Sequence, residues 1–160
     1  MRLFLGLGSN LGDRKQNLQR ATEQVETHIG EILKASSIYE TQAWGIENQP
    51  DFLNQVLEIN TQFEPEKILE IVLIIEQNMG RERQIKWGER LIDIDILFYE
   101  NWVLRTEKLM IPHPFLQDRN FVLAPLVEIA PDFVHPVLQR SIRDLFLDSK
   151  DHLVVKILTE

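Results

Sequence analysis

The sequence predicts an α/β (α+β) fold with a ferredoxin-like core, and three observations lead to this prediction. Residues 91–97 alternate between apolar side chains and aspartates, which is typical of a β-strand. Segments 14–29 and 65–79 carry apolar residues at helical spacing. Strand-like segments lie before, between and after them, which gives the split β-α-β-β-α-β order. Because 160 residues can bury one core, we expect residues 1–160 to form a single three-layer domain with C-terminal additions.

The first strand and helix are predicted from the N-terminal 30 residues. Residues 2–8 form an apolar run that we interpret as a buried strand, because it is too short and too weakly basic for a secretory signal. A helix is expected to begin at about Arg14, with Asp13 as its N-cap. Gly30 stands at the position that follows a helix C-cap, where glycine is common.

The next elements complete the core. Residues 32–39 read as a strand. Residues 52–61 read as another, because apolar and polar side chains alternate well enough along them. Pro65 is suited to the first turn of a second helix, and Gly80 is placed to end it. The strand that contains residues 91–97 follows this helix and closes the β-α-β-β-α-β order.

The remaining chain adds short elements. Extended pieces are expected around residues 102–111, and a helical stretch near 119–129 contains Pro125. A short helix around 141–147 precedes a possible last strand at 153–158.

The composition excludes several classes of function. The chain has no cysteine, which excludes disulfides, thiolate catalysis and zinc–sulfur sites and favours a cytoplasmic location. A net charge of −8 argues against a general nucleic-acid binder. No apolar run approaches the roughly 20 residues that a membrane span needs, so we expect no membrane partner.

Asp93 and Asp95 are the strongest candidates for a functional site. In a strand they point to the same face, about 7 Å apart, while the neighbouring isoleucines point to the opposite face. Two adjacent carboxylates repel each other and stay charged most easily beside a cation, so the pair suggests a hard metal ion. The alternative is a strand that simply exposes one polar face to solvent.

A cationic segment comes directly before this strand. Arg81, Arg83 and Lys86 lie between Gly80 and Gly88, and Arg90 follows Gly88. Carboxylate-bound Mg²⁺ can bridge phosphate oxygens while arginines neutralise the remaining negative charge, so segment and strand together favour polyphosphate chemistry. Taken alone, the segment could equally be a solvated run of charges.

Two further segments leave alternatives open. Residues 6–14 are rich in glycine, but they match neither a P-loop nor a dinucleotide fingerprint, so the residues favour a strand-to-helix turn. Residues 39–54 could form a slot for a flat heterocycle, with aromatic rings on its faces and amides at its edge. An ordinary loop whose aromatic side chains lie in the core is the favoured alternative.

His113 lies between two prolines, and Arg119 follows six residues later. The histidine is a poor transition-metal ligand, because the chain has no cysteine and no second histidine nearby. It could donate a hydrogen bond to phosphate or be a packed or capping residue.

In these motifs the chain resembles the 6-hydroxymethyl-7,8-dihydropterin pyrophosphokinase family over nearly its whole length. The shared motifs are Gly8-Ser9-Asn10-Leu11-Gly12, Tyr39-x-Thr41, Gln49-Pro50-Asp51-Phe52-Leu53-Asn54, Gly80-Arg81-x-Arg83, Trp87-Gly88-x-Arg90-x-x-Asp93-x-Asp95, Pro112-His113, Arg119-x-Phe121 and Pro125-Leu126-x-Glu128-Ile129-Ala130-Pro131. Each motif is weak by itself, but all of them in this order are specific.

The resemblance implies a ferredoxin-like fold and transfer of the terminal diphosphate of ATP to the pterin hydroxymethyl group in folate biosynthesis, with release of AMP. It implies that Asp93 and Asp95 hold two Mg²⁺ ions and that Arg81 and Arg90 close over the phosphates. The implied pterin-binding residues are Thr41, Gln42, Trp44, Phe52, Asn54, Trp87 and Phe121. The implied ATP-binding residues are Glu76, Arg83, Ile96, Lys108, His113 and Arg119.

The motifs contain no obvious general base, so metal-bound solvent or an aspartate is left to take the proton of the attacking hydroxyl. A non-catalytic module that binds a small anion and a metal-dependent phosphohydrolase are the rival functions. The expected partners are the small-molecule substrates, and we expect a monomer.

Overall fold

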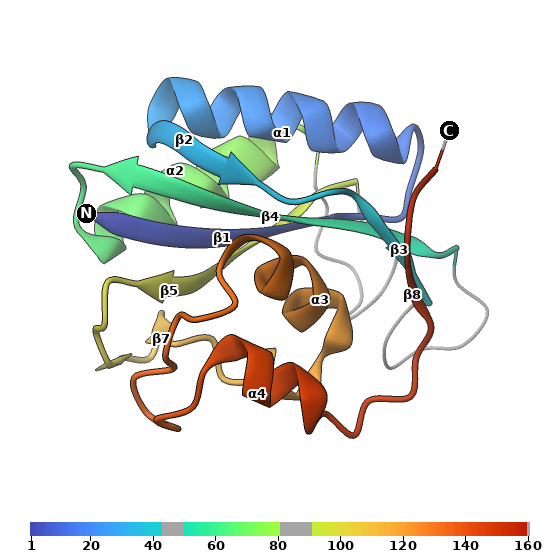
Figure 1. The fold of residues 1–160 in the computed structure, drawn as a ribbon. Coiled ribbons are helices and arrows are strands. Elements are labelled where there is room, and N and C mark those ends of the chain that lie inside the picture. Colours follow the sequence, from blue (N-terminus) through green and yellow to red (C-terminus); the bar gives the residue numbers. More distant parts are fainter. Residues whose placement is uncertain (43–49, 81–90, 160) are drawn as a thin grey trace.

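A computed structural model describes residues 1–42, 50–80 and 91–159 (Figure 1). The strands are β1 Arg2–Ser9, β2 Gly30–Ala35, β3 Tyr39–Thr41, β4 Phe52–Thr61, β5 Asp93–Tyr99, β6 Leu104–Arg105, β7 Met110–Ile111 and β8 Val155–Ile157. The helices are α1 Arg14–His28, α2 Pro65–Asn78, α3 Asn120–Ile129 and α4 Ile142–Leu147, and a 3-10 turn, η1, spans Leu116–Asp118. The predicted order of elements is confirmed.

In the described chain, one six-stranded sheet carries the fold. Its strands run in the order β5-β1-β4-β3-β8, and β2 pairs with β4 beside β3. Every pair is antiparallel. The four strands of the predicted core therefore lie in the order β5-β1-β4-β2, which is the arrangement that a ferredoxin-like fold requires.

Helices cover both faces of this sheet, which confirms three layers (Figure 1). Leu3, Leu5 and Leu7 of β1 pack with α1 and α2 on one face. Phe4 of the same strand packs with α3 and α4 on the other face, because alternate residues of a strand point to opposite sides. Each face has its own apolar core, and the second core is built largely from the C-terminal part of the chain.

The predicted helix ends are confirmed where the structure describes them. The side chain of Asp13 accepts a hydrogen bond from the backbone of Gln16 and caps α1. Gly80 follows α2 with a φ of +88°, a conformation that suits glycine. In the described part, no helix is long and apolar enough to cross a membrane.

The strand predicted over residues 32–39 is wrong in one respect, because it is two strands, β2 and β3. Ala35 is opposite Leu57 and Tyr39 is opposite Asn54, so three residues face two on β4. Ser36 fills the break, since its backbone donates to Val56 and its hydroxyl accepts from Val56. This extra residue ends one ladder and starts the next.

A second irregularity lies in β5, which begins at Asp93 and continues to Tyr99 rather than spanning 91–97. The register with β1 shifts between Phe4 and Leu5. As a result, Leu97 and Phe98 both pack in the core beside α3 and α4. The bulge keeps Asp93, Asp95 and Leu97 on the same face of the sheet while Phe98 stays opposite Phe4.

Gly30 is required for a different reason from the one the sequence suggested. It follows the C-cap Ile29, but it belongs to β2, and only Gly12 and Gly80 have positive φ among the described glycines. A Cβ atom at Gly30 would lie 2.1 Å from the carbonyl oxygen of Asn60. The glycine is therefore needed for the close approach of β2 to β4.

We expect Gly30→Ala to lower the free energy of unfolding by about 3 kcal/mol or more, because backbone must move to admit the methyl group. Urea unfolding measures this loss. Gly6→Ala is the control, since its Cβ would meet only Leu97, at an ordinary 3.5 Å. Equal stability losses in the two variants would contradict the explanation.

Candidate active site

The two aspartates of β5 share one wall of a cleft on the α3 side of the sheet. Ile92, Ile94 and Ile96 are buried in the core against α1 and α2. Asp93 and Asp95 point the other way and line the cleft. The predicted shared orientation of the aspartates is confirmed. The cleft has a volume of about 690 Å³ when the solvent at its mouth is included.

Two glycines of β1 form the floor of the cleft beside the aspartates. Gly6 is opposite Asp95, and Gly8 is opposite Asp93 on one side and Asn54 on the other. A Cβ atom at Gly8 would lie 3.0 Å from Oδ1 of Asn54. The missing side chains therefore leave an open strip between the aspartates and the amide, two strand spacings or about 10 Å wide.

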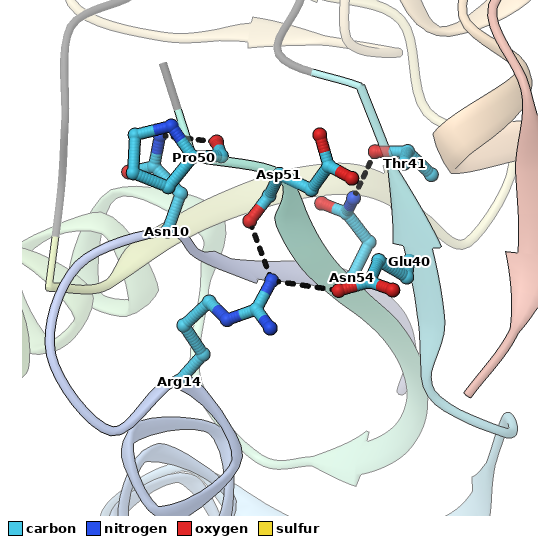
Figure 2. Close-up of polar contacts among 7 residues, drawn as sticks. All are labelled: Asn10, Arg14, Glu40, Thr41, Pro50, Asp51 and Asn54. Carbon is cyan, nitrogen blue, oxygen red and sulfur yellow. Dashed lines mark hydrogen bonds and ion pairs between the residues drawn. The ribbon is translucent and has the colours of Figure 1, made fainter. Parts of the chain in front are cut away.

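The far wall carries the residues that suit a flat polar ring. Asn54 of β4 is buried and its Nδ2 donates to Oγ1 of Thr41 on β3, over 2.9 Å (Figure 2). Phe52 lines the cleft beside them, and Gln42 lines it just beyond the end of β3. Phe121 of α3 contributes a second ring from the opposite layer. The described residues of this segment therefore fit a slot with aromatic walls and an amide edge better than an ordinary loop whose aromatic side chains lie in the core.

Arg119 brings a buried positive charge to the cleft. It immediately precedes α3, lines the cleft and is 8% exposed. Its guanidinium carbon lies 5.0 Å from the ring centre of Phe115 and 5.6 Å from that of Phe121. These cation–π contacts hold the guanidinium near two aromatic rings, in the same cleft that Asp93 and Asp95 line.

His113 lies beside Asp95 and is held there by the backbone. The backbone N–H of His113 donates to the backbone carbonyl of Leu97, next to the bulge in β5. Its Nδ1 accepts from the backbone of Phe115, so the neutral ring carries its proton on Nε2. Nε2 lies 4.0 Å from Oδ2 of Asp95.

The charge state of His113 follows from its surroundings. Burial and the positive charge of Arg119 lower the pKa of His113 to about 4, against the opposing effect of Asp93. The ring is therefore neutral near pH 7 and serves as a hydrogen-bond donor rather than as a cation.

The lowered pKa of His113 predicts a pH-dependent loss of stability. Between pH 6.5 and 4 the unfolded chain binds a proton that the folded chain does not, so stability falls as the pH is lowered through this range. We expect the free energy of unfolding to fall by about 2 kcal/mol between pH 7.5 and pH 5 because of His113. This contribution should be missing in His113→Gln. Urea unfolding of both proteins at the two pH values measures it, and equal losses would contradict the prediction.

Three residues expected at the ATP side lie away from the floor of the cleft. Glu76 of α2 is buried, and its Oε2 accepts from the backbone of Ile94 in β5, the end strand of the described sheet, over 2.9 Å. The side chain of Ile96 is in the core, so only its backbone could reach a nucleotide. Lys108 is exposed in the turn between β6 and β7. The structure does not bring Lys108 together with the aspartates among the residues it describes.

Five predicted site residues lie outside the described residues. They are Trp44, Arg81, Arg83, Trp87 and Arg90. The cationic segment expected beside Asp93 and Asp95 therefore stays a prediction. In the described part, no group of three or more histidine or acidic side chains is arranged to hold a metal. Two carboxylates suit Mg²⁺, which commonly takes its other ligands from phosphates and water.

A model of the 7,8-dihydro-6-hydroxymethylpterin-pyrophosphokinase (HPPK) family matches residues 4–131, which include every described residue of the cleft. The chain belongs to this family. The activity of the HPPK family is the transfer of a diphosphate group to hydroxymethyl-dihydropterin in folate biosynthesis.

Relatives named for the same activity support the assignment. The chain is 45% identical over 142 residues to the 2-amino-4-hydroxy-6-hydroxymethyldihydropteridine pyrophosphokinase of Aquifex aeolicus, and the match covers 89% of this chain and 88% of the relative. Identity to the enzyme of that name from Bacillus subtilis is 44% over 127 residues, which covers 79% and 76% of the two chains.

Larger proteins contain a similar unit. The folic acid synthesis protein fol1 of Pneumocystis carinii is 38% identical over 156 residues, which are 98% of this chain and 21% of that protein. The crystal structure of wild-type Plasmodium falciparum HPPK-DHPS with pteroate has a TM-score of 0.75 and 19% identity. The match covers 91% of this chain and 42% of that solved chain, and it shows the shared fold.

The sequence analysis missed the role of Gly6 and Gly8. Both lie within β1, inside the strand predicted over residues 2–8, and of the segment read as a strand-to-helix turn only Gly12 has a positive φ, of +70°. What was not predicted is that Gly6 and Gly8 leave the floor of the cleft open. Their alternation with buried leucines was the available signal, because glycines two apart in a strand remove side chains from one face.

Proposed function

We propose that this chain uses ATP as its diphosphate donor and Mg²⁺ held by Asp93 and Asp95. The transfer of diphosphate to hydroxymethyl-dihydropterin follows from family membership, and the donor, the metal and the residue roles are the proposal. The main support for the proposal is the position of Gly8 in β1, opposite Asp93 on one neighbouring strand and opposite Asn54 on the other. Because Gly8 has no side chain, the cleft is open between these two residues.

We assign the pterin to the half of the cleft that contains Asn54. Its ring would lie between Phe52 and Phe121, with Thr41, Asn54 and the chain at Gln42 at its polar edge. A ring seated there would extend its hydroxymethyl group over Gly8 toward Asp93. The arrangement brings the acceptor oxygen to the charged wall, so that positioning supplies much of the rate.

We assign the triphosphate to the space beside the aspartates. Bound Mg²⁺ would neutralise the phosphates and polarise the phosphorus that the hydroxyl attacks. Arg119 and the Nε2–H of His113 are placed to bind phosphate oxygens, and Glu76 and the Ile96 backbone to meet the nucleoside at the edge of β5. Arg81, Arg83, Arg90, Trp44, Trp87 and Lys108 retain the roles that the family resemblance implies.

Product analysis tests the proposal. The purified chain is incubated with ATP, Mg²⁺ and 6-hydroxymethyl-7,8-dihydropterin, and nucleotides are separated by chromatography. We expect AMP whose formation requires the pterin and is abolished by EDTA. Formation of ADP or phosphate without pterin would instead indicate a phosphohydrolase, and the absence of turnover would indicate a binding module.

A further inference from the structure

Arg14 joins three separate parts of the chain behind the pterin half of the cleft (Figure 2). It lies in the first turn of α1, and its Nη1 donates to Oε2 of Glu40 over 2.9 Å and to the carbonyl of Asp51 over 2.7 Å. Nearby, Nδ2 of Asn10 donates to the carbonyl of Pro50 over 3.2 Å. The helix end is thereby tied to the end of β3 and to the residues that lead into β4.

These contacts act on the strands that carry the cleft residues. In the ladder of β3 and β4, Glu40 is opposite Leu53 and Thr41 is opposite Phe52. Leu53 packs in the core on the α1 side, so Glu40 points to that side as well. Thr41 and Phe52 point to the cleft. Arg14 therefore contacts β3 and the residue that precedes β4 on the α1 side of the sheet. The opposite side of the same two strands forms the aromatic and amide wall of the cleft.

The contacts are partly sheltered from solvent. The side chain of Arg14 is 29% exposed and that of Glu40 is 21% exposed. A charged donor shared by a carboxylate and a carbonyl makes stronger hydrogen bonds than a neutral one. On the cleft side of the sheet, the Asn54–Thr41 hydrogen bond also links β4 to β3. Side-chain hydrogen bonds therefore hold this pair of strands on both faces of the sheet.

We propose that Arg14 is a positioning residue for the pterin half of the cleft. By holding the Glu40 side chain and the Asp51 carbonyl, it fixes the spacing of Thr41 and Phe52 before the pterin arrives. The proposal rests on the proposed function, because it assumes that the pterin occupies this half. It predicts an effect on pterin binding that is separate from nucleotide binding.

Steady-state kinetics with each substrate varied in turn tests this role. We expect Arg14→Ala to raise the KM for pterin about fivefold or more, with the KM for ATP and kcat changed less than about twofold. Direct titration of the pterin should show the same loss of affinity. Arg14→Lys should recover part of it, because lysine keeps the charge but not the forked geometry.

Arg143→Ala is the matched control. It removes an arginine–carboxylate pair of 2.8 Å with Asp132, on α4 and outside the residues that line the cleft. A merely structural role for Arg14 would lower the stability of Arg14→Ala but leave its two KM values in their original ratio, as expected for Arg143→Ala. An unchanged pterin KM, or equal rises in both KM values, would overturn the proposal.

Glu40→Gln provides a second route should Arg14→Ala not fold. It replaces the carboxylate by a neutral amide oxygen and leaves the bond from Arg14 to the Asp51 carbonyl, so we expect a smaller rise, about twofold, in the pterin KM. In the double variant Arg14→Ala/Glu40→Gln the effects should not add, because both substitutions act on the same contact. Additive effects would overturn the proposal, whereas absence of pterin-dependent AMP in the unaltered chain would overturn the proposed function together with it.

Discussion

Asp93→Asn and Asp95→Asn are each expected to lower kcat about a thousandfold or more while leaving the fold intact. Each substitution keeps the shape of the side chain and removes the charge that would hold Mg²⁺ against the phosphates, an interaction worth several kcal/mol in the transition state. AMP formation with saturating substrates measures the loss. The side chain of Asp95 is 39% exposed, so its removal should change the thermal midpoint only slightly.

Asp132→Asn is the control for these variants. Asp132 is 81% exposed, and its contact with Arg143 lies outside the residues that line the cleft. We expect full activity from it and a stability change of at most about 1 kcal/mol. Near-full activity of either Asp93→Asn or Asp95→Asn would show that the metal assignment is wrong.

Gly8→Val is expected to abolish pterin turnover by filling the floor of the cleft. Even the Cβ atom of alanine would lie 3.0 Å from Oδ1 of Asn54 and 3.6 Å from the ring of Phe52. The two extra methyl groups of valine would occupy the strip between Asn54 and Asp93. Valine suits a β-strand, so we expect the folded state to remain. Pterin titration and AMP formation should both fail, while circular dichroism stays unchanged.

Gly8→Ala and Gly6→Ala form a matched pair in the same strand. The first should raise the pterin KM about tenfold or more, because Asn54 must move from its hydrogen bond with Thr41. The second meets only Leu97, at 3.5 Å, and should have a clearly smaller effect. Equal effects of the two alanines would contradict a specific role for the space above Gly8.

Much of the candidate site could be predicted from local pattern. The alternation around Asp93 and Asp95 placed both carboxylates on one face and the isoleucines on the other, as the structure confirms. Strand alternation is a short-range property, set by the backbone geometry of two successive residues. The family motifs added Thr41, Asn54 and Phe121, which the fold brings to the same cleft.

Contacts between distant segments were beyond this kind of prediction. The bonds from Arg14 to Glu40 and Asp51 span 26 and 37 residues, and no period in the sequence marks them. Gly30 was assigned to a helix cap, yet its reason is the carbonyl of Asn60 on a neighbouring strand. The break at Ser36 likewise depends on how β2 and β3 share β4.

The sequence by itself determined the order of the elements, the identity of the acidic pair and the orientation of both aspartates opposite the isoleucines, because these depend on periodicity and residue chemistry along a few consecutive residues. Only the tertiary structure decided that Gly8 separates Asp93 from Asn54, that His113 is neutral beside Asp95, and that Arg14 supports the wall of the cleft. The physical reason is that strand register, burial and charge proximity arise when residues far apart in the chain pack together, and these distances are not present in any local pattern.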